Sequence, residues 1–221
     1  MPTPVVAHRT RPLIGWVRVV VGAAVILVVL YAYVEGAGHG RVNPFDYFGY
    51  FTNLTSLLTS GVLILTGVRA LHGLDAPTRL VEARAVGTAC VLVVAAIYNG
   101  LVPGTASAPP WVSAVLHAVF PCYAALDWLL ARDRQALPWR RLWIVLPYPL
   151  LWLTVVLVRG ATDGWVPYGF LLPERGSPSL LLHVAGLLIV LLVAGAAVWG
   201  AGRLPGPRAI ARRIRQSTAS Q

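Results

Sequence analysis

The chain has 221 residues, of which 57% are hydrophobic, and its mean hydropathy is +0.70. Only 12% of the residues are charged, about half the share found in soluble domains, so the composition excludes an ordinary soluble globular fold. The formal net charge of +10 comes from 18 basic residues, all of them arginine, against eight acidic ones.

Six apolar runs are each long enough to cross the hydrocarbon of a bilayer, which takes about 20 residues in a helix. We expect helices over residues 13–35, 48–71, 81–101, 111–131, 139–159 and 180–201. The connections between them are short and rich in glycine and proline, so consecutive helices should be antiparallel neighbours. The sequence therefore predicts an all-α, six-span integral membrane protein in which residues 1–221 form a single membrane domain.

The arginines are distributed unevenly over the connections. Fifteen lie at the N-terminus, around the second and fourth connections and after the sixth run, and three lie elsewhere: Arg41, Arg159 and Arg175. This alternation is the positive-inside bias, and it predicts a plasma-membrane protein with both termini in the cytoplasm. The basic tail, residues 203–221, should rest on anionic lipid headgroups. Nucleic acid is the weaker alternative as a partner, because the sequence offers no folded basic face. The oligomeric state stays open.

The second run carries many hydroxyl groups. Four of them share one face of the expected helix, because they follow the spacing i, i+3, i+4, i+7: Thr52, Thr55, Ser56 and Thr59. Asn53 and Ser60 lie at the edge of that face. Small hydroxyl-bearing residues are common where membrane helices pack closely, and packing is the favoured interpretation for all of the hydroxyls below Thr52.

A polar layer is expected near the outer ends of several helices. At a rise of about 1.5 Å per residue, Thr52 should lie roughly 6 Å and His117 roughly 9 Å below the outer surface. Asn99, at the end of the third run, and His183, near the start of the sixth, belong to the same layer. Tyr98 and Glu35 are further candidates for it.

His117 is distinguished by the proline four residues later. Pro121 has no N–H to donate to the His117 carbonyl, so the helix should kink and leave that carbonyl bare beside the imidazole. Ionisable groups and irregular backbone inside a membrane point to a cavity with a function. An imidazole beside the Thr52 hydroxyl can take its proton during attack and return it to the leaving group.

The sequence leaves the oxyanion donors and the cover of such a site less well determined. The oxyanion of the reaction could be met by Asn53, Asn99 or freed backbone groups, and the sequence does not choose. Asp127 lies roughly 15 Å along the helix from His117, so we expect it to be structural and to pair with Arg132 or Arg134. The long fifth connection carries Trp165, Tyr168 and Phe170, which suit either the outer membrane interface or a cap folded over a cavity.

Neither a metal nor a cofactor is predicted. The histidines and acidic residues of the outer half lack the H-x3-H and H-E-x-x-H spacings, so a metal would need ligands from separate helices. These residues are Glu35, His39, Asp46, His117 and His183. Cys90 and Cys122 fall inside expected spans and are interpreted as packing residues.

Three segments resemble one family of six-span membrane proteins: "YFGYFTNLTSLL" from Tyr47, "LHAVFPCYAALDWLL" from Leu116 and "LPYPLLWLTVVLVRG…GWVPYGFLLP" from Leu146. The family comprises bacterial relatives of the androgen-induced and androgen-dependent membrane hydrolases of animals, and the likeness runs from about residue 45 to 173. The resemblance implies hydrolysis of fatty acid esters of hydroxy fatty acids, with Thr52 as the nucleophile and His117 as the histidine. The sequence departs from the family pattern at Val166, Gly169 and Leu172.

Two functions follow from these observations. The first is an intramembrane hydrolase of lipid esters whose cavity is lined by Thr52 and His117, with Thr55 as a rival nucleophile one turn deeper. The second is a non-enzymatic membrane protein that binds or handles lipid or a small solute. Side chains of Thr52 and His117 near hydrogen-bond reach favour the first, and side chains facing apart exclude it. Further residues expected at the site or its cavity are Asn53, Thr55, Ser56, Asn99, Trp165, Tyr168 and His183.

Overall fold

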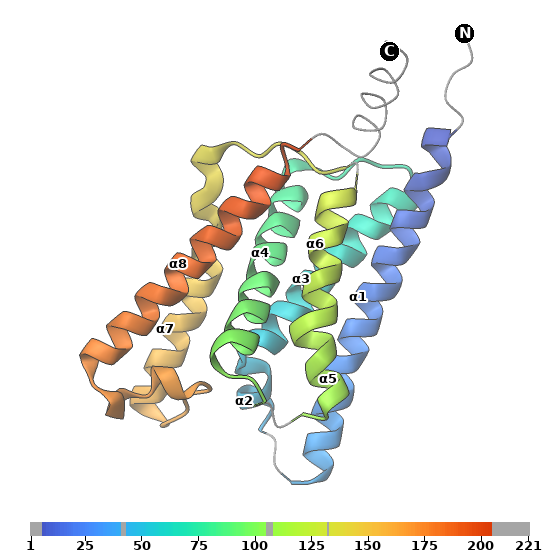
Figure 1. Cartoon of the computed structure of the whole chain (residues 1–221). Helices are drawn as coiled ribbons and strands as arrows, with labels where there is room; N and C mark the ends of the chain where they lie inside the picture. The colour runs from blue at the N-terminus through green and yellow to red at the C-terminus, as the bar shows by residue number, and fades with distance from the viewer. Residues whose placement is uncertain (1–5, 41–42, 105–107, 132, 205–221) are drawn as a thin grey trace, which may run out of the picture.

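The computed structural model describes residues 6–40, 43–104, 108–131 and 133–204, and within them the chain is helical with no β-strand. The long helices lie side by side as one bundle (Figure 1). They are α1 (Val6–Gly38), α3 (Phe51–Leu71), α4 (Thr78–Leu101), α7 (Pro147–Thr162), α8 (Ser177–Ala201), and a rod made of α5 (Pro110–Ala114), η1 (Val115–Val119) and α6 (Phe120–Leu130). The short helices are α2 (Pro44–Gly49), η2 (Trp139–Val145), η3 (Gly169–Leu171) and η4 (Pro173–Arg175).

Six segments of this bundle are long and apolar enough to cross a membrane. They are Pro12–Gly38, Phe51–Leu71, Thr78–Leu101, Pro110–Leu130, Trp139–Thr162 and Ser177–Ala201. The prediction of an all-α chain with six apolar helices of membrane-spanning length is confirmed, and each expected boundary lies within three residues of the observed one. The second span begins later than expected because Tyr50 is extended (φ −62°, ψ 132°) and separates α2 from α3.

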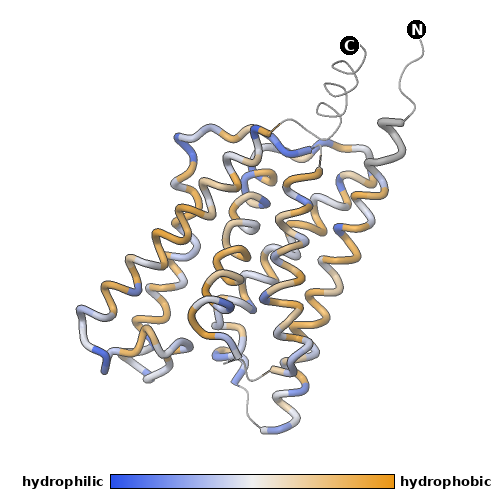
Figure 2. The backbone as a smooth tube through the Cα atoms, in the orientation of Figure 1, coloured by the Kyte–Doolittle hydropathy of each residue, from blue (hydrophilic) through white to orange (hydrophobic). Residues whose placement is uncertain are grey.

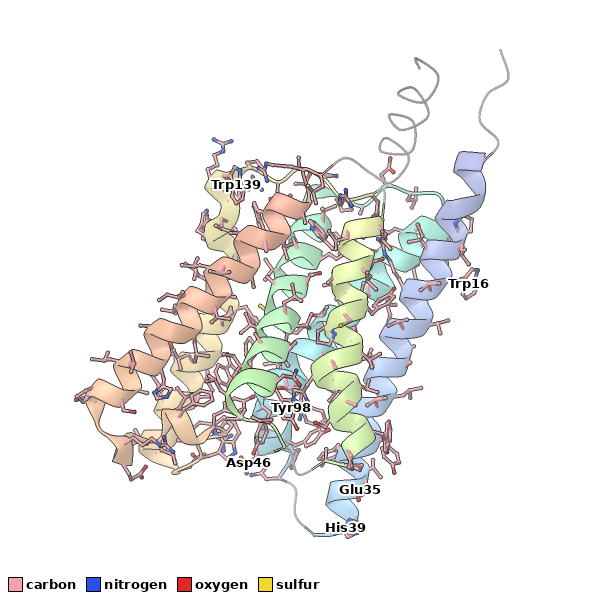
Figure 3. All side chains as sticks on the ribbon, viewed as in Figure 1. Trp16, Glu35, His39, Asp46, Tyr98 and Trp139 are labelled. Carbon is pink, nitrogen blue, oxygen red and sulfur yellow. The ribbon has the colours of Figure 1, made fainter. Side chains whose placement is uncertain are left out.

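The two ends of the bundle differ, and we name them for the description below. The site end holds α2, α5 and the connection between α7 and α8, and the opposite end holds the start of α1 and the end of α8 (Figure 1). Apolar residues dominate between the two ends, and hydrophilic residues gather toward them (Figure 2). Trp16 and Trp139 lie toward the opposite end (Figure 3), and both are exposed. Which end faces the cytoplasm stays a prediction from the arginines. Arg41, Arg132 and residues 205–221 of the basic tail lie outside the described residues.

Close backbone contact joins α1 to α3. A Cβ added to Gly15 would lie 2.8 Å from the Gly67 carbonyl oxygen, and one added to Gly22 would lie 2.8 Å from the Ser60 carbonyl oxygen. Small residues let membrane helices approach in this way. The hydroxyl face of α3 turns to the other side, where the Thr59 hydroxyl lies 2.8 Å from the position a Cβ would take on Gly87 of α4. The packing interpretation of these hydroxyls therefore agrees with their contacts.

α4 lies at the centre of the bundle, against α3, α6 and α8. One apolar cluster joins α4 to α8 and η2, a second joins α1, α3 and the α5–η1–α6 rod, and a third joins α7 to η3 and α8. The Trp128 indole N–H of α6 donates to the Val198 carbonyl of α8 at 2.8 Å, which fixes α8 at the opposite end. At the site end, α7 and α8 lie further from α4 (Figure 1).

A buried ion cluster ties α1, α4 and α6 together near the opposite end. The Arg18 Nε donates to Asp127 Oδ1 at 2.8 Å, and Arg84 Nη2 donates to Asp133 Oδ1 at 3.0 Å. Asp127 is structural, as expected, but its expected pairing is wrong for Arg134, which donates to the backbone carbonyls of Trp128 and Leu204 instead. Arg132 lies outside the described residues. Arg18 and Arg84, which the sequence suggested as loop charges, are 0% and 1% exposed because the aspartates pair with them.

Candidate active site

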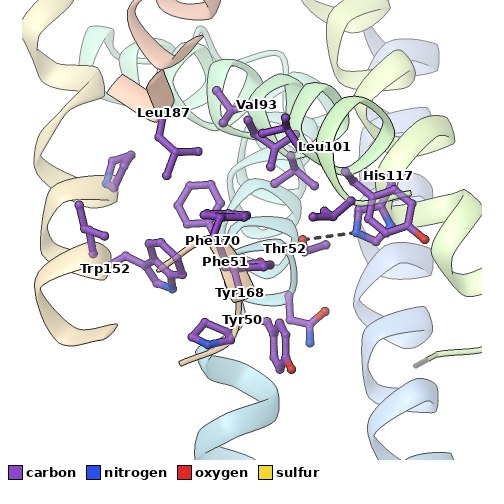
Figure 4. Close-up of a pocket in the computed structure, with 18 of the residues that line it drawn as sticks. Tyr50, Phe51, Thr52, Val93, Leu101, His117, Trp152, Tyr168, Phe170 and Leu187 are labelled. Carbon is purple, nitrogen blue, oxygen red and sulfur yellow. Dashed lines mark hydrogen bonds between the residues drawn. The ribbon is translucent and has the colours of Figure 1, made fainter. Parts of the chain in front are cut away.

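A cavity of about 560 Å³ lies at the site end, among α3, α4, the α5–η1 segment, α7, α8 and the connection that follows α7. This volume is within the usual range of ligand-binding cavities. Thr52 and His117 lie at one side of the cavity, and Trp152 and Leu187 lie at the opposite side (Figure 4). Leu101 and Leu150 line the cavity and are also 60% and 40% exposed, so the cavity opens to the surface of the bundle.

Thr52 is positioned by the junction between α2 and α3. The Trp152 indole N–H donates to the Gly49 carbonyl at 2.8 Å. Trp165 packs on Gly49 from another side, so closely that a Cβ there would lie 2.7 Å from the indole ring. The chain then turns at the extended Tyr50, and Thr52 becomes the second residue of α3, facing the cavity. Two tryptophans therefore fix the start of the helix that carries the hydroxyl.

His117 faces Thr52 across the cavity. The Thr52 Oγ1 lies 3.4 Å from the His117 Nε2 (Figure 4). On the other side of the ring, His117 Nδ1 lies 2.9 Å from the Ser113 carbonyl oxygen. Because a carbonyl only accepts, Nδ1 carries the proton and Nε2 presents its lone pair to the hydroxyl. The Ser113 carbonyl thus orients the imidazole as a carboxylate does in a catalytic triad.

Tyr98 holds the imidazole from its face. The two ring centroids are 3.6 Å apart with planes 15° from parallel. The Ser113 hydroxyl donates to the Tyr98 hydroxyl at 2.8 Å, so α4 and α5 hold the same assembly. Figure 3 shows Tyr98 within the bundle at the site end. His117 is 8% exposed, and its position is fixed on both ring nitrogens and one face.

The carbonyl freed by Pro121 is capped by Asn99. Residues 115–119 form a π-helical turn, closed by the Phe120 N–H on the Val115 carbonyl. Asn99 Nδ2 donates to the His117 carbonyl at 3.0 Å and to the Ala95 carbonyl at 2.8 Å. The expectation of a bare carbonyl is therefore wrong. Asn99 is also outside the cavity lining with both amide hydrogens engaged, so it is not an oxyanion donor.

The deeper hydroxyls do not line the cavity. The Thr55 hydroxyl is buried and lies 2.8 Å from the Tyr148 hydroxyl, away from His117. Ser56 is also buried, and its hydroxyl has no hydrogen-bond partner in the described part of the chain. Placing these two residues at the cavity was wrong, because only the first turn of α3 reaches it. Asn53 does line the cavity, with one amide hydrogen donated to the Tyr47 carbonyl at 2.8 Å.

The connection between α7 and α8 folds over the cavity. Phe170 and Leu171 are buried, and Tyr168 lines the cavity together with His183 of α8. The alternative of a cap thus describes this segment better than a free interfacial loop. Trp165 does not line this cavity, contrary to expectation. It lies under the Arg159 guanidinium, 4.2 Å from the ring centroid, beside a separate groove between α3 and α7.

The Tyr168 hydroxyl reaches the start of α3. Burial raises the pKa of this phenol to about 12, and polar groups at the start of α3, which are the Thr52 hydroxyl and the backbone of Phe51 and Thr52, partly oppose the rise. The phenol therefore stays protonated at neutral pH and remains a hydrogen-bond donor beside Thr52.

The candidate metal ligands of the sequence are dispersed. The His39 Nδ1 lies 2.8 Å from the Glu35 carbonyl oxygen, and Asp46 pairs with Arg159 at 2.7 Å. Within the described ranges, no three histidine, cysteine, aspartate or glutamate side chains come together. Cys90 is buried and Cys122 is exposed, and neither forms a disulfide.

Sequence reasoning missed Ser113, Tyr148 and Trp152. Ser113 stands four residues before His117, which is the spacing that brings a helical carbonyl to an imidazole, so its role was within reach of the pattern. Tyr148 and Trp152 belong to α7 and act on α3, and no local pattern relates the two helices.

The fold and the cavity define the class: a multi-pass membrane protein with a largely apolar cavity between its helices at one end. No family model, curated protein or solved structure matches this chain. The resemblance carried by the three sequence segments stays a prediction.

Proposed function

We propose that the protein is an intramembrane hydrolase of lipid esters, with Thr52 as the nucleophile and His117 as the general base. The observation that carries this proposal is the 3.4 Å approach of Thr52 Oγ1 to a His117 Nε2 whose partner nitrogen is held by a carbonyl. Catalytic hydrogen bonds are commonly longer before substrate binds. The sequence resemblance points to the same two residues and to fatty acid esters of hydroxy fatty acids as substrates.

The chemistry proceeds in two steps. In the first, Nε2 takes the proton of the Thr52 hydroxyl while Oγ1 attacks the ester carbonyl, and the imidazolium returns that proton to the departing alcohol. This leaves an acyl group on Thr52. In the second, Nε2 takes a proton from water as the water oxygen attacks the acyl group, and Thr52 leaves with that proton. The products are an alcohol and a carboxylic acid.

The start of α3 supplies groups for the oxyanion of each step. The N-terminus of α3 has no side-chain cap, and the first bonded amide is that of Leu54, which donates to the Tyr50 carbonyl at 3.1 Å. The first amides of a helix point along its axis and carry its positive end. The N–H group of Asn53, with the Tyr168 hydroxyl, is therefore the candidate for the oxyanion donor.

The remainder of the cavity fits an acyl chain. Its wall beyond the dyad is made by aliphatic and aromatic side chains: Val93, Ile97, Trp152, Leu153, Phe170 and Leu187. A lipid ester can enter from the bilayer because part of this wall is on the lipid-facing surface. No cofactor is needed for this reaction, since the chain supplies a nucleophile, a base and oxyanion donors.

Covalent labelling tests the proposal. The purified protein in mild detergent is treated with a fluorophosphonate carrying a lipid tail, as wild type and as Thr52→Ala, His117→Ala and Thr55→Ala. Labelling should be lost with Thr52→Ala and fall by about 100-fold or more with His117→Ala. It should persist with Thr55→Ala, the matched control, because that hydroxyl shares the helix face but not the cavity.

Two outcomes contradict the proposal. Labelling that disappears only with Thr55→Ala moves the nucleophile one turn deeper. A folded wild-type protein that is not labelled, and that releases no fatty acid from a lipid ester, favours a lipid-binding protein without catalysis. Thermal unfolding of each variant separates loss of reactivity from loss of fold.

A further inference from the structure

One arginine stands at the rim of the cavity. Arg175 is the single formally charged residue in the cavity lining within the described ranges. It ends η4, which begins at Pro173 and follows the fully buried Leu171. Gly176, with φ of 82°, then turns the chain into α8. The Arg175 side chain is exposed, but its backbone is held by Pro173 and the buried Leu171 before it and by the start of α8 after it.

The charge of Arg175 is not used by the protein itself. In the part of the chain that the structure describes, Arg175 makes no ion pair, although Glu174 is its neighbour in sequence. Arg159, also at the site end, shows the contrast. Its Nη2 lies 2.7 Å from Asp46 Oδ1 and 2.7 Å from Asp163 Oδ2, and its guanidinium covers Trp165. Arg159 therefore joins α2 to the end of α7 through its ion pairs, whereas the charge of Arg175 is available to a ligand at the cavity rim.

The surroundings of Arg175 favour an anion with an apolar attachment. The nearby start of α8 adds the positive end of a 25-residue helix. The cavity lining is otherwise mostly aliphatic and aromatic, and Phe170 stacks on His183 with ring centroids 5.7 Å apart. A guanidinium matches a carboxylate with two parallel hydrogen bonds. A ligand that fills the cavity thus places an apolar chain between an ester at Thr52 and an anionic group at Arg175.

We infer that Arg175 binds an anionic group of the substrate, a carboxylate at the end of an apolar chain, and so selects charged lipid esters over neutral ones. This inference rests on the proposed hydrolase function and assigns the residue that sets its specificity. Arg175 is not among the groups assigned to the reacting bond, so it should affect binding rather than the chemical step.

A matched pair of substrates tests the inference. One is a long-chain ester with a free carboxylate on its second chain, and the other is the same ester with that carboxylate methylated. Both are assayed in neutral detergent with wild type, Arg175→Gln, Arg175→Lys and Glu174→Gln. The wild-type KM should be at least about tenfold lower for the acid than for the methyl ester. Arg175→Gln should abolish this preference by raising the KM for the acid alone, with kcat unchanged.

The other two variants are controls. Arg175→Lys should recover part of the preference, because it keeps the charge but loses the paired hydrogen bonds. Glu174→Gln should leave both KM values unchanged, because its side chain is exposed and outside the cavity lining. Equal KM values for the two esters in wild type, or an equal change for both in Arg175→Gln, would overturn the inference.

A phospholipid phosphate is also an anion that the Arg175 guanidinium could bind. A further experiment distinguishes it from the substrate carboxylate. Phosphatidylglycerol is added to the micelles at rising mole fraction. If Arg175 binds lipid headgroups and not the substrate carboxylate, this lipid changes the KM of the acid and of the methyl ester equally, which overturns the inference. If Arg175 binds the substrate carboxylate, the lipid phosphate competes for the same guanidinium and raises the KM for the acid alone.

Binding without hydrolysis separates this inference from the proposed function. Thr52→Ala is titrated with a radiolabelled long-chain fatty acid and with the corresponding fatty alcohol, with and without Arg175→Gln. Tighter binding of the acid that depends on Arg175 supports the anion site, even where no ester is cleaved. Equal binding of acid and alcohol overturns it, even where the dyad is active.

Discussion

The chemical role of His117 is set by its neighbours. An imidazole inside a membrane helix has several possible uses, and the sequence alone leaves them open. Here the Ser113 carbonyl accepts a hydrogen bond from the Nδ1–H, Tyr98 covers one face of the ring and Thr52 lies at the free nitrogen. Tyr168 completes this arrangement from the far connection. These four residues come from four different segments, so each depends on the fold for its place.

At the residue scale, Tyr168→Phe tests the oxyanion assignment. The substitution keeps the ring but removes the donor beside Thr52, so kcat should fall by about 10- to 1,000-fold with little change in KM. Because the pKa of Tyr168 is raised to about 12, the phenol is a donor throughout the neutral and mildly alkaline range. Steady-state hydrolysis measured from about pH 7 to pH 9 should therefore show a constant ratio of wild type to variant. An unchanged kcat contradicts the assignment.

The α5–η1–α6 rod shows how an element can be interrupted and still satisfy its backbone. Pro121 removes one N–H, the chain widens into a π-helical turn, and the freed His117 carbonyl accepts from Asn99 of α4. Turns of this type recur at functional sites because they redirect a side chain without ending the helix. The polar group that repairs the backbone is thus a neighbour of the group that we assign to catalysis.

At the element scale, Asn99→Ala should unpair the His117 carbonyl. Leaving a buried acceptor without a partner costs about 1–3 kcal/mol, and we expect a lower midpoint of thermal unfolding together with weaker fluorophosphonate labelling. Pro121→Ala provides the control, because it restores a backbone N–H that can pair within the helix. The loss caused by Asn99→Ala should be smaller in the Pro121→Ala background. Equal losses in both backgrounds would contradict the repair by Asn99.

The α2–α3 junction gives a second test at this scale. Gly49→Ala places a Cβ 2.7 Å from the Trp165 ring, so the start of α3 must shift and Thr52 moves with it. We expect kcat to fall at least about tenfold, since small misplacements at a reacting centre have large effects. Gly100→Ala is the matched control, because nothing lies within 4 Å of a Cβ there. If both substitutions act alike on hydrolysis, the junction does not position Thr52.

Over the whole molecule, the two ends of the bundle are held together differently. The opposite end is fixed by buried charges, with Arg18 and Arg84 between Asp127 and Asp133. The site end contains a cavity instead, which is covered by the connection between α7 and α8 and is open to the surface of the bundle. The contacts at the opposite end hold the helices together there, while α7 and α8 lie further from α4 at the site end (Figure 1).

The ion cluster predicts acid sensitivity. Burial by itself would raise the pKa of Asp133, but the hydrogen bond from Arg18 and the charge of Arg84 outweigh it and hold the pKa well below the usual range. A lowered pKa stabilises the fold at pH values above the ordinary aspartate pKa of about 4, and this stabilisation is lost as the pH falls toward the folded-state pKa. Thermal unfolding midpoints should be steady near neutral pH and drop below about pH 4.

Asp133→Asn checks the origin of that drop. The variant should be less stable than wild type at neutral pH, and the difference should narrow as the pH falls, because wild type loses the same charge. A difference that stays constant down to about pH 3 would mean that Asp133 does not titrate in this way.

Several features of the protein were predictable from the sequence because they depend on local composition. The six spans follow from the length of apolar runs, and their bounds need no knowledge of neighbours. The level shared by Thr52 and His117 follows from helix rise and a common entry point, and the 3.4 Å distance agrees with it. Irregular backbone at His117 follows from one missing N–H at Pro121.

Only the tertiary structure decided which polar groups meet. Arg18 and Arg84 look like loop charges in sequence but are buried, because aspartates from α6 and beyond reach them. The sequence suggests that Asn99 binds a ligand, but its side chain donates to the His117 carbonyl instead. The sequence also suggests that Trp165 lines the cavity, but its ring packs against Gly49 instead. The physical reason is that a membrane helix satisfies its own backbone, so the sequence determines each helix separately. The partners of its side chains come from other helices, and their identity depends on how the helices pack.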